Sequence, residues 1–293
     1  MTMSLTRPTW TPMSAEQRAQ FDRDGFLIIR GVLSPAEVQR YTAAMDQVYA
    51  ATPPQRLGPD GSLHALSAVT SCPELAGLIA HPKAFPLVFS VLGWNVHIYH
   101  SHLDVHPRVR QAKPPWWHWH QDGGRQNREL ETDPRPRLSV KLAFWLSDVS
   151  QQGRGNLTVV PGSHRRNWLP GPPRRDVAWP APEGAIQVQV HPGDVVFFDR
   201  RLWHARTDNA SDVVRKVAFF GYTYRWIAIR DDVAALPRQP WWSGLDDVQR
   251  QLLGGAGDGT GDHRWGHDPA STPLYGQLRE RGLLDPAYPP LIP

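Results

Sequence analysis

A histidine and an aspartate two residues apart, His120 and Asp122, are the residues best suited to chemistry in this chain. They end an aromatic-rich run, residues 115–122, whose composition favours a strand. Successive side chains of a strand point to opposite faces, so His120 and Asp122 share one face and offer an imidazole and a carboxylate to a divalent metal ion. His118 lies on the same face and is an alternative ligand.

His204 is the candidate for a third ligand, at the end of the stretch 193–204. The polar residues 207–212 separate two strand-like runs, which predicts a hairpin that turns at Asn209 and Ala210. In this hairpin Arg215 is directly opposite His204, and opposed residues of an antiparallel pair project from the same face. A shift of register by one residue would separate the two side chains.

Two histidines and one carboxylate with open coordination positions are the ligand set of non-heme Fe(II) oxygenases. An arginine beside such a centre can hold the distant carboxylate of an oxo acid through a bidentate pair. A zinc hydrolase has suitable ligands as well, but it gives Arg215 no role. The residues therefore favour an iron centre with an oxo-acid cosubstrate.

The elements around these residues fall into three parts of what we predict to be one domain, residues 1–293. Residues 1–93 begin with a loose tail over residues 1–12 and are otherwise mainly helical, with capping boxes at Ser14 and Ser34. This part also holds a short strand at residues 26–29 and a helix over roughly residues 73–92 with a break near His81 and Pro82. Residues 94–225 form short strands between Gly and Pro turns, which predicts a mainly β sandwich or closed double sheet. Residues 226–293 are an irregular extension with two short helices and a glycine-rich loop at residues 254–261. The predicted strands span residues 96–105, 115–122, 138–146, 157–160, 186–190, 195–198, 202–206 and 213–225.

The composition argues against several classes of protein. The chain has 293 residues and a net charge of +4 at pH 7, and its arginines are scattered, which argues against nucleic-acid binding. Cys72 is the single cysteine, so the chain has no internal disulfide and no cysteine-based zinc cluster. A secretory signal and long apolar runs are lacking, and we expect a cytoplasmic protein with a small-molecule substrate and no membrane or nucleic-acid partner.

Three motifs together resemble the phytanoyl-CoA dioxygenase family of Fe(II)/2-oxoglutarate-dependent oxygenases, over roughly residues 15–225. They are His120-Gln121-Asp122, the Gly-Asn-Leu-Thr-Val-Val-Pro-Gly-Ser-His run at residues 155–164, and the stretch from Gly193 through His204 to Arg215. The resemblance implies a double-stranded β-helix (jelly roll, cupin-like) with flanking helices. It also implies that His120, Asp122 and His204 bind Fe(II) and that Arg215 binds 2-oxoglutarate.

The same resemblance implies a reaction. O2 and 2-oxoglutarate are consumed, succinate and CO2 are released, and an unactivated C–H bond of a small molecule is hydroxylated. The carboxylate of Asp122 argues against halogenation, since halogenating relatives lack it. Desaturation, epoxidation or another oxidative rearrangement at the same centre is an alternative, as is a non-catalytic metal- or ligand-binding module. The arginine-rich composition suggests natural product (specialised-metabolite) biosynthesis.

Further site candidates lie near these residues. By the family pattern, His100 and Lys141 are expected to contact the cosubstrate. His118, on the strand face of His120, and Trp119 and Trp203, which flank the ligands in sequence, are expected to face the substrate. The chain departs from the pattern at one position. Many members carry a small hydroxyl residue two positions after the distal histidine, whereas this chain has Arg206.

Overall fold

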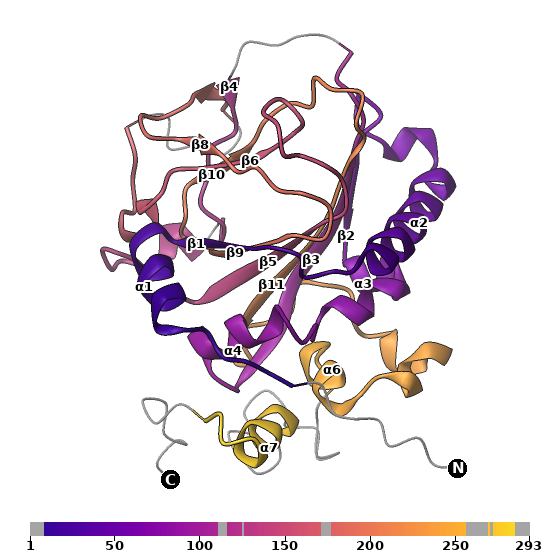
Figure 1. The fold of residues 1–293 in the computed structure, drawn as a ribbon, viewed down its shortest axis with the longest axis vertical. Coiled ribbons are helices and arrows are strands. Elements are labelled where there is room, and N and C mark those ends of the chain that lie inside the picture. The colour runs from indigo at the N-terminus through magenta and orange to yellow at the C-terminus, as the bar shows by residue number, and fades with distance from the viewer. Residues whose placement is uncertain are drawn as a thin grey trace.

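Two antiparallel sheets face each other at the centre of the molecule, and helices pack against the outer face of the larger one (Figure 1). The structure, a computed structural model, describes residues 9–110, 116–124, 126–170, 177–255, 269 and 272–284. The larger sheet has the order β1-β9-β5-β11-β3-β2, the smaller sheet β10-β6-β8, and β4 pairs with β7. Strands that are distant in sequence thus become neighbours, as in a jelly roll. The mainly β fold predicted from the sequence is confirmed.

The strands of the larger sheet are β1 (Phe26–Ile29), β2 (Leu63–Leu66), β3 (Val96–His106), β5 (Ser139–Trp145), β9 (Val195–Asp199) and β11 (Arg215–Tyr224). Those of the smaller sheet are β6 (Leu157–Val159), β8 (Ile186–Gln187) and β10 (His204–Arg206), and the separate pair is β4 (Trp116–Trp117) and β7 (Trp179–Pro180). The α-helices are α1 (Ala15–Asp24), α2 (Pro35–Ala51), α3 (Ala68–Ser71), α4 (Phe85–Leu92), α5 (Gln126–Glu129), α6 (Asp247–Leu252) and α7 (Pro273–Glu280). The 3-10 helices are η1 (Pro54–Arg56), η2 (Pro73–Leu78), η3 (Ser163–Arg165), η4 (Leu236–Arg238) and η5 (Pro240–Gly244).

Both predicted capping boxes are present. The Ser14 hydroxyl accepts a hydrogen bond from the Gln17 N–H at 3.1 Å, and the Gln17 side chain accepts one from the Ser14 N–H at 3.0 Å. Ser34 and Glu37 repeat this arrangement at the start of α2. Each box satisfies two backbone donors that the first helical turn leaves unpaired, and so fixes where the helix begins.

The strands of the larger sheet alternate between two apolar layers. Leu142, Phe144 and Phe220 pack on the helical side. Trp145, Val217 and their alternating neighbours pack toward the smaller sheet. Side chains alternate across a strand, so a continuous apolar run such as β5 is buried on both faces. The two layers hold the larger sheet rigidly between the helices and the smaller sheet.

Several elements differ from the sequence prediction. The N-terminal part contributes β1 and β2 to the larger sheet, and β2 was not predicted. The helix predicted over residues 73–92 with a break near His81 and Pro82 is the 3-10 helix η2 followed by α4, and the predicted break lies in the gap between them. Trp10, predicted to lie in a loose tail, is buried against Phe85 and Phe89. The glycine-rich loop predicted at residues 254–261 lies mostly outside the described residues. Within the described part of the chain, no helix is long and apolar enough to cross a membrane.

Candidate active site

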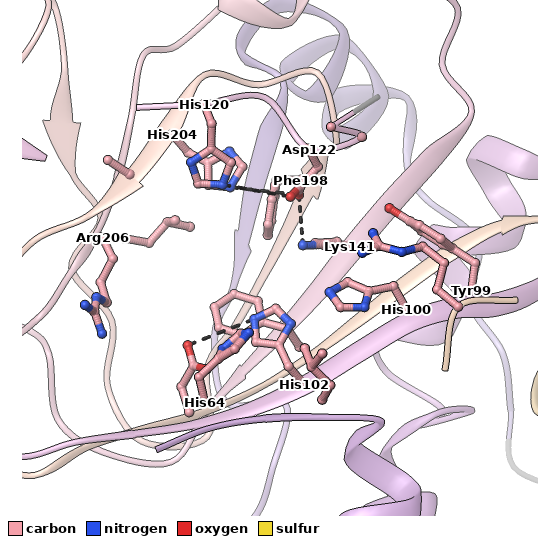
Figure 2. A pocket seen from close by; sticks show the side chains of 18 of the residues that line it. His64, Tyr99, His100, His102, His120, Asp122, Lys141, Phe198, His204 and Arg206 are labelled. Carbon is pink, nitrogen blue, oxygen red and sulfur yellow. Dashed lines mark hydrogen bonds and ion pairs between the residues drawn. The ribbon is translucent and has the colours of Figure 1, made fainter. Parts of the chain in front are cut away.

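A cavity of about 880 Å³ opens between the two sheets. β2, β3, β5, β9 and β11 line it from the larger sheet, and β6 and β10 line it from the smaller sheet. The turn that begins at Asp122 closes part of its rim. The lining is rich in imidazole, carboxylate and guanidinium groups, as Figure 2 shows. These polar groups make the cavity suited to charged ligands.

His120, Asp122 and His204 meet on one side of this cavity (Figure 2). Their ligand atoms all lie within 4.8 Å of one another. Nε2 of His120 is 4.0 Å from Oδ1 of Asp122, and Nε2 of His204 is 3.9 Å from Oδ2 of the same residue. The three side chains predicted as ligands are therefore brought together in a group that could hold a metal ion.

Backbone pairing brings the two histidines together. His120 and His204 form an isolated antiparallel bridge in which each N–H donates to the carbonyl of the other at 2.9 Å. The strand predicted over residues 115–122 is confined to Trp116–Trp117, so that prediction was too long. Asp122 begins a turn and donates its N–H to the Arg200 carbonyl at 2.9 Å. The carboxylate thus reaches the site from a turn and not from a regular strand face.

The ring orientation of both histidines is set by hydrogen bonds to the backbone. Nδ1 of His120 donates to the His118 carbonyl at 2.8 Å, and Nδ1 of His204 donates to the Leu202 carbonyl at 2.8 Å. A carbonyl oxygen can only accept, so the hydrogen of each neutral ring is on Nδ1. Nε2, the atom that faces Asp122, then carries a lone pair. This is the tautomer in which an imidazole binds a metal ion.

Lys141 is the counter-ion of Asp122. Its Nζ lies 2.9 Å from Oδ2 of Asp122, and both side chains are buried. Burial alone disfavours the charged carboxylate, but the ammonium of Lys141 outweighs it and holds the pKa of Asp122 well below its usual range. Asp122 is therefore an ionised ligand at neutral pH.

Arg215 lies at the start of β11, fully buried in the wall of the same cavity. Its Nη1 is 3.4 Å from Oδ2 of Asp104, and its guanidinium lies 5.0 Å from the centroid of the Trp145 ring. Burial lowers the pKa of Arg215 to about 10, which leaves it charged at neutral pH. An arginine fixed in this way is preorganised to receive an anion.

The hairpin predicted between His204 and Arg215 is wrong. His204 pairs with Val159 in the smaller sheet, whereas Arg215 pairs with His106 in the larger sheet. The polar residues between them form a loop organised by Asn209, whose amide donates to the carbonyls of His106 and Val213 at 3.0 and 2.7 Å. The two side chains line one cavity because the sheets face each other, and not because the residues are opposed in one ladder.

The cavity face of β3 was not identified as a unit from the sequence. His100, His102, Asp104 and His106 follow one another at every second position and all line the cavity. Such a period of two in ionisable residues is a detectable signal, because one strand face carries all of them. Of this face, the sequence prediction included only His100, whose Nδ1 lies 3.6 Å from Oδ1 of Asp231.

This face also creates a second group of potential metal ligands, His64, His102 and Asp104. Nδ1 of His64 is hydrogen-bonded to Oδ1 of Asp104 at 2.7 Å, and Nε2 of His102 is 4.0 Å from Oδ2 of that residue. Burial disfavours the ionised form of Asp104, but the three neighbouring histidines and Arg215 hold the pKa of its carboxyl well below the usual range. Two groups, each of two histidines and one aspartate, are therefore candidates for the metal site.

The remaining sequence candidates lie elsewhere. His118 is exposed and is not among the residues that line the large cavity. Trp119 and Trp203 are buried in a separate aromatic cluster with Trp179. They line a smaller hollow of about 320 Å³, which shares His120 and Gly124 with the large cavity.

Comparison with known proteins places the chain among dioxygenases. The sequence model of the phytanoyl-CoA dioxygenase (PhyH) family matches residues 21–217. Ectoine dioxygenase from Nocardia farcinica is 24% identical over 280 residues, covering 83% of this chain and 89% of the relative.

Two solved structures share the fold. HygX from Streptomyces hygroscopicus, solved with nickel and 2-oxoglutarate bound, has a TM-score of 0.59 at 20% identity, covering 75% of this chain and 90% of that one. The carbocyclase SnoK from nogalamycin biosynthesis, described as α-ketoglutarate dependent, has a TM-score of 0.57 at 24% identity, covering 79% and 94%.

Proposed function

The chain belongs to the phytanoyl-CoA dioxygenase family, and from that premise we propose that it is an Fe(II)- and 2-oxoglutarate-dependent dioxygenase that hydroxylates an unactivated C–H bond of a small molecule. In this proposal His120, Asp122 and His204 hold the iron, and Arg215 holds the cosubstrate. The family match spans all of these residues. The Nδ1 hydrogen bonds of the two histidines carry the proposal, because they aim both Nε2 lone pairs at one carboxylate.

The second histidine–aspartate group fits a metal ion less well. The carboxylate of Asp104 is already hydrogen-bonded to His64 at 2.7 Å and lies 3.4 Å from the guanidinium of Arg215. That guanidinium is buried and stays charged, so a divalent cation beside it would be repelled. Lys141, the cation beside Asp122, lies against Oδ2, so Oδ1 and the Nε2 atoms of His120 and His204 stay available to a metal ion. We therefore assign the metal to the first group.

Iron bound there would supply the oxidising chemistry, with 2-oxoglutarate converted to succinate and CO2. The chain itself positions the reactants. The backbone bridge fixes both imidazole ligands, and Arg215 orients the cosubstrate through its distant carboxylate. Phe198 and Phe219 supply apolar wall on either side of Lys141, whose Nζ is 6.0 Å from both ring centroids.

The substrate is proposed to be small and polar, and specialised metabolism to be its setting. The cavity wall opposite the proposed metal ligands carries His64, His100 and His102, which suit a polar molecule better than an acyl chain (Figure 2). Two similar proteins support this choice, since one is an ectoine dioxygenase and the other acts in nogalamycin biosynthesis.

Succinate formation tests the proposed function. Purified protein is supplied with Fe(II), 2-oxoglutarate and O2, with and without a pool of small polar metabolites, and succinate is measured by mass spectrometry. We expect iron-dependent succinate, stimulated by the substrate, and a product that has gained one oxygen atom. A product that has lost two hydrogens would indicate desaturation instead. Protein that forms no succinate and binds no 2-oxoglutarate with Fe(II) would be a binding module, and the proposal would fail.

A further inference from the structure

Four side chains form a continuous chain of contacts at the end of the cavity where Arg215 lies. Nη1 of Arg215 is 3.4 Å from Oδ2 of Asp104, and Nε2 of His106 is 3.7 Å from the same oxygen. The guanidinium of Arg206 contacts the ring of His106. Arg206 lies two residues beyond His204 on β10, so both side chains belong to one strand face, and both line the cavity (Figure 2).

Without Arg206, this end of the cavity offers no net positive charge to an incoming anion. Asp104 and Arg215 are both buried, and the carboxylate neutralises the guanidinium. A second carboxylate brought to Arg215 would meet a pair with no net charge and would be repelled by Asp104 nearby. Arg206 restores one positive charge at this place. Its side chain is exposed, so it has the freedom to turn toward an anion, whereas Arg215 is fixed.

We propose that Arg206 and Arg215 together bind the distal carboxylate of the oxo-acid cosubstrate, with Arg206 supplying the charge that Asp104 withdraws from Arg215. This inference rests on the proposed function, because it assumes a cosubstrate with two acidic ends. Arg206 thereby gains a role at the position where the chain departs from the family pattern. We call this pair of arginines the clamp. It predicts a compensation, because removal of Asp104 should make Arg206 dispensable for cosubstrate binding.

Calorimetric titration of 2-oxoglutarate into Ni(II)-loaded protein tests this compensation. Nickel holds the cosubstrate without turnover, and pH 8 keeps an ordinary imidazole neutral, so that arginine and aspartate set the charge. Arg206→Ser should weaken binding by about tenfold or more, the loss of one charge-assisted hydrogen bond. Asp104→Asn should tighten it. The double variant should bind within about threefold of the wild type, because coupled residues are not additive.

Arg230→Ser is the matched control. Arg230 lines the same cavity, but it is not part of this contact chain, and its substitution should leave 2-oxoglutarate binding unchanged. Equal binding by the wild type and Arg206→Ser would overturn the clamp and leave the proposed function standing. A double variant that binds no better than Arg206→Ser would also overturn it. A Ni(II)-loaded wild type that binds no 2-oxoglutarate would overturn the proposed function, and the clamp with it.

Discussion

The two carboxylate oxygens of Asp122 have different partners, and these partners determine how removal of the side chain affects metal binding and stability. Oδ1 faces His120, while Oδ2 faces both His204 and the ammonium of Lys141. From the sequence alone, removal of a side chain at a strand edge is expected to leave the fold intact. The structure adds a structural cost, because Lys141 is buried and depends on this carboxylate.

Asp122→Ala is predicted to abolish metal binding and also to destabilise the protein. An unpaired buried charge costs about 3–5 kcal/mol, so chemical denaturation should show a loss of this order. Addition of Lys141→Met should recover most of the stability but none of the metal binding. An Asp122→Ala variant as stable as the wild type would show that Lys141 finds another partner or neutralises easily.

Arg215→Ala is predicted to raise the KM for 2-oxoglutarate far more than the KM for the prime substrate. Loss of a bidentate charged contact costs about 2–3 kcal/mol, which is roughly 30- to 150-fold. Arg215→Lys should recover little, because an ammonium lacks the planar fork. Steady-state kinetics with each substrate varied separately gives the answer. Equal rises in both KM values would assign Arg215 another role.

At the scale of elements, the turn before β6 shapes the wall beside Arg215. Gly155 has φ +73°, a conformation that favours glycine, and a Cβ at this position would lie 2.6 Å from Cδ of Arg215. Gly153, two residues earlier, has φ +81° with nothing within 4 Å of such a Cβ. Substitution of Gly153 therefore tests backbone strain alone, whereas substitution of Gly155 adds contact with Arg215.

Gly155→Ala is predicted to raise the KM for 2-oxoglutarate, because the new methyl group displaces the Arg215 side chain. Gly153→Ala should carry a similar backbone cost, about 1 kcal/mol, without a change in this KM. Kinetics and thermal denaturation of both variants distinguish the two effects. A rise in KM of equal size in both would attribute it to backbone strain alone.

The sequence predicted most elements but not how they meet. Local signals such as the capping boxes and the apolar run of β5 fixed those elements correctly. The predicted hairpin was wrong because a polar segment between two strands does not indicate whether the strands belong to the same sheet. His120, Asp122 and His204 were predicted as a group from their types and order, and the structure brings them together although the predicted local geometry was wrong. The β3 face was missed because the partners His64 and Arg215 belong to β2 and β11, which the folded sheet brings beside β3.

At the scale of the whole molecule, buried histidines link stability to pH. His97 is 5% exposed, and Nε2 of its ring donates to the Ile227 carbonyl at 2.8 Å. Burial lowers the pKa of His97 to about 4, below the ordinary value near 6.5. The unfolded chain thus binds the proton more readily than the folded chain between these values. Stability is fully present above pH 6.5 and is lost as the pH falls toward 4.

His97 alone should contribute about 2 kcal/mol to this loss between pH 7 and pH 4.5, because protonation of the unfolded chain is favoured over this range. Chemical denaturation between pH 7 and pH 4.5 measures it. His97→Gln keeps a hydrogen-bond donor but cannot titrate, so it should flatten the pH dependence by part of that amount. An unchanged slope in His97→Gln would mean that the pKa of His97 is the same in the folded and unfolded chain, which would contradict this account.

The choice between the two histidine–aspartate groups is the central claim, and iron stoichiometry tests it most directly. Protein is equilibrated anaerobically with Fe(II), dialysed, and analysed for metal, with His204→Ala and His64→Ala as a matched pair. We predict one iron per chain in the wild type, its loss in His204→Ala, and its retention in His64→Ala. Iron that is retained in His204→Ala and lost in His64→Ala would contradict the assignment of His120, Asp122 and His204.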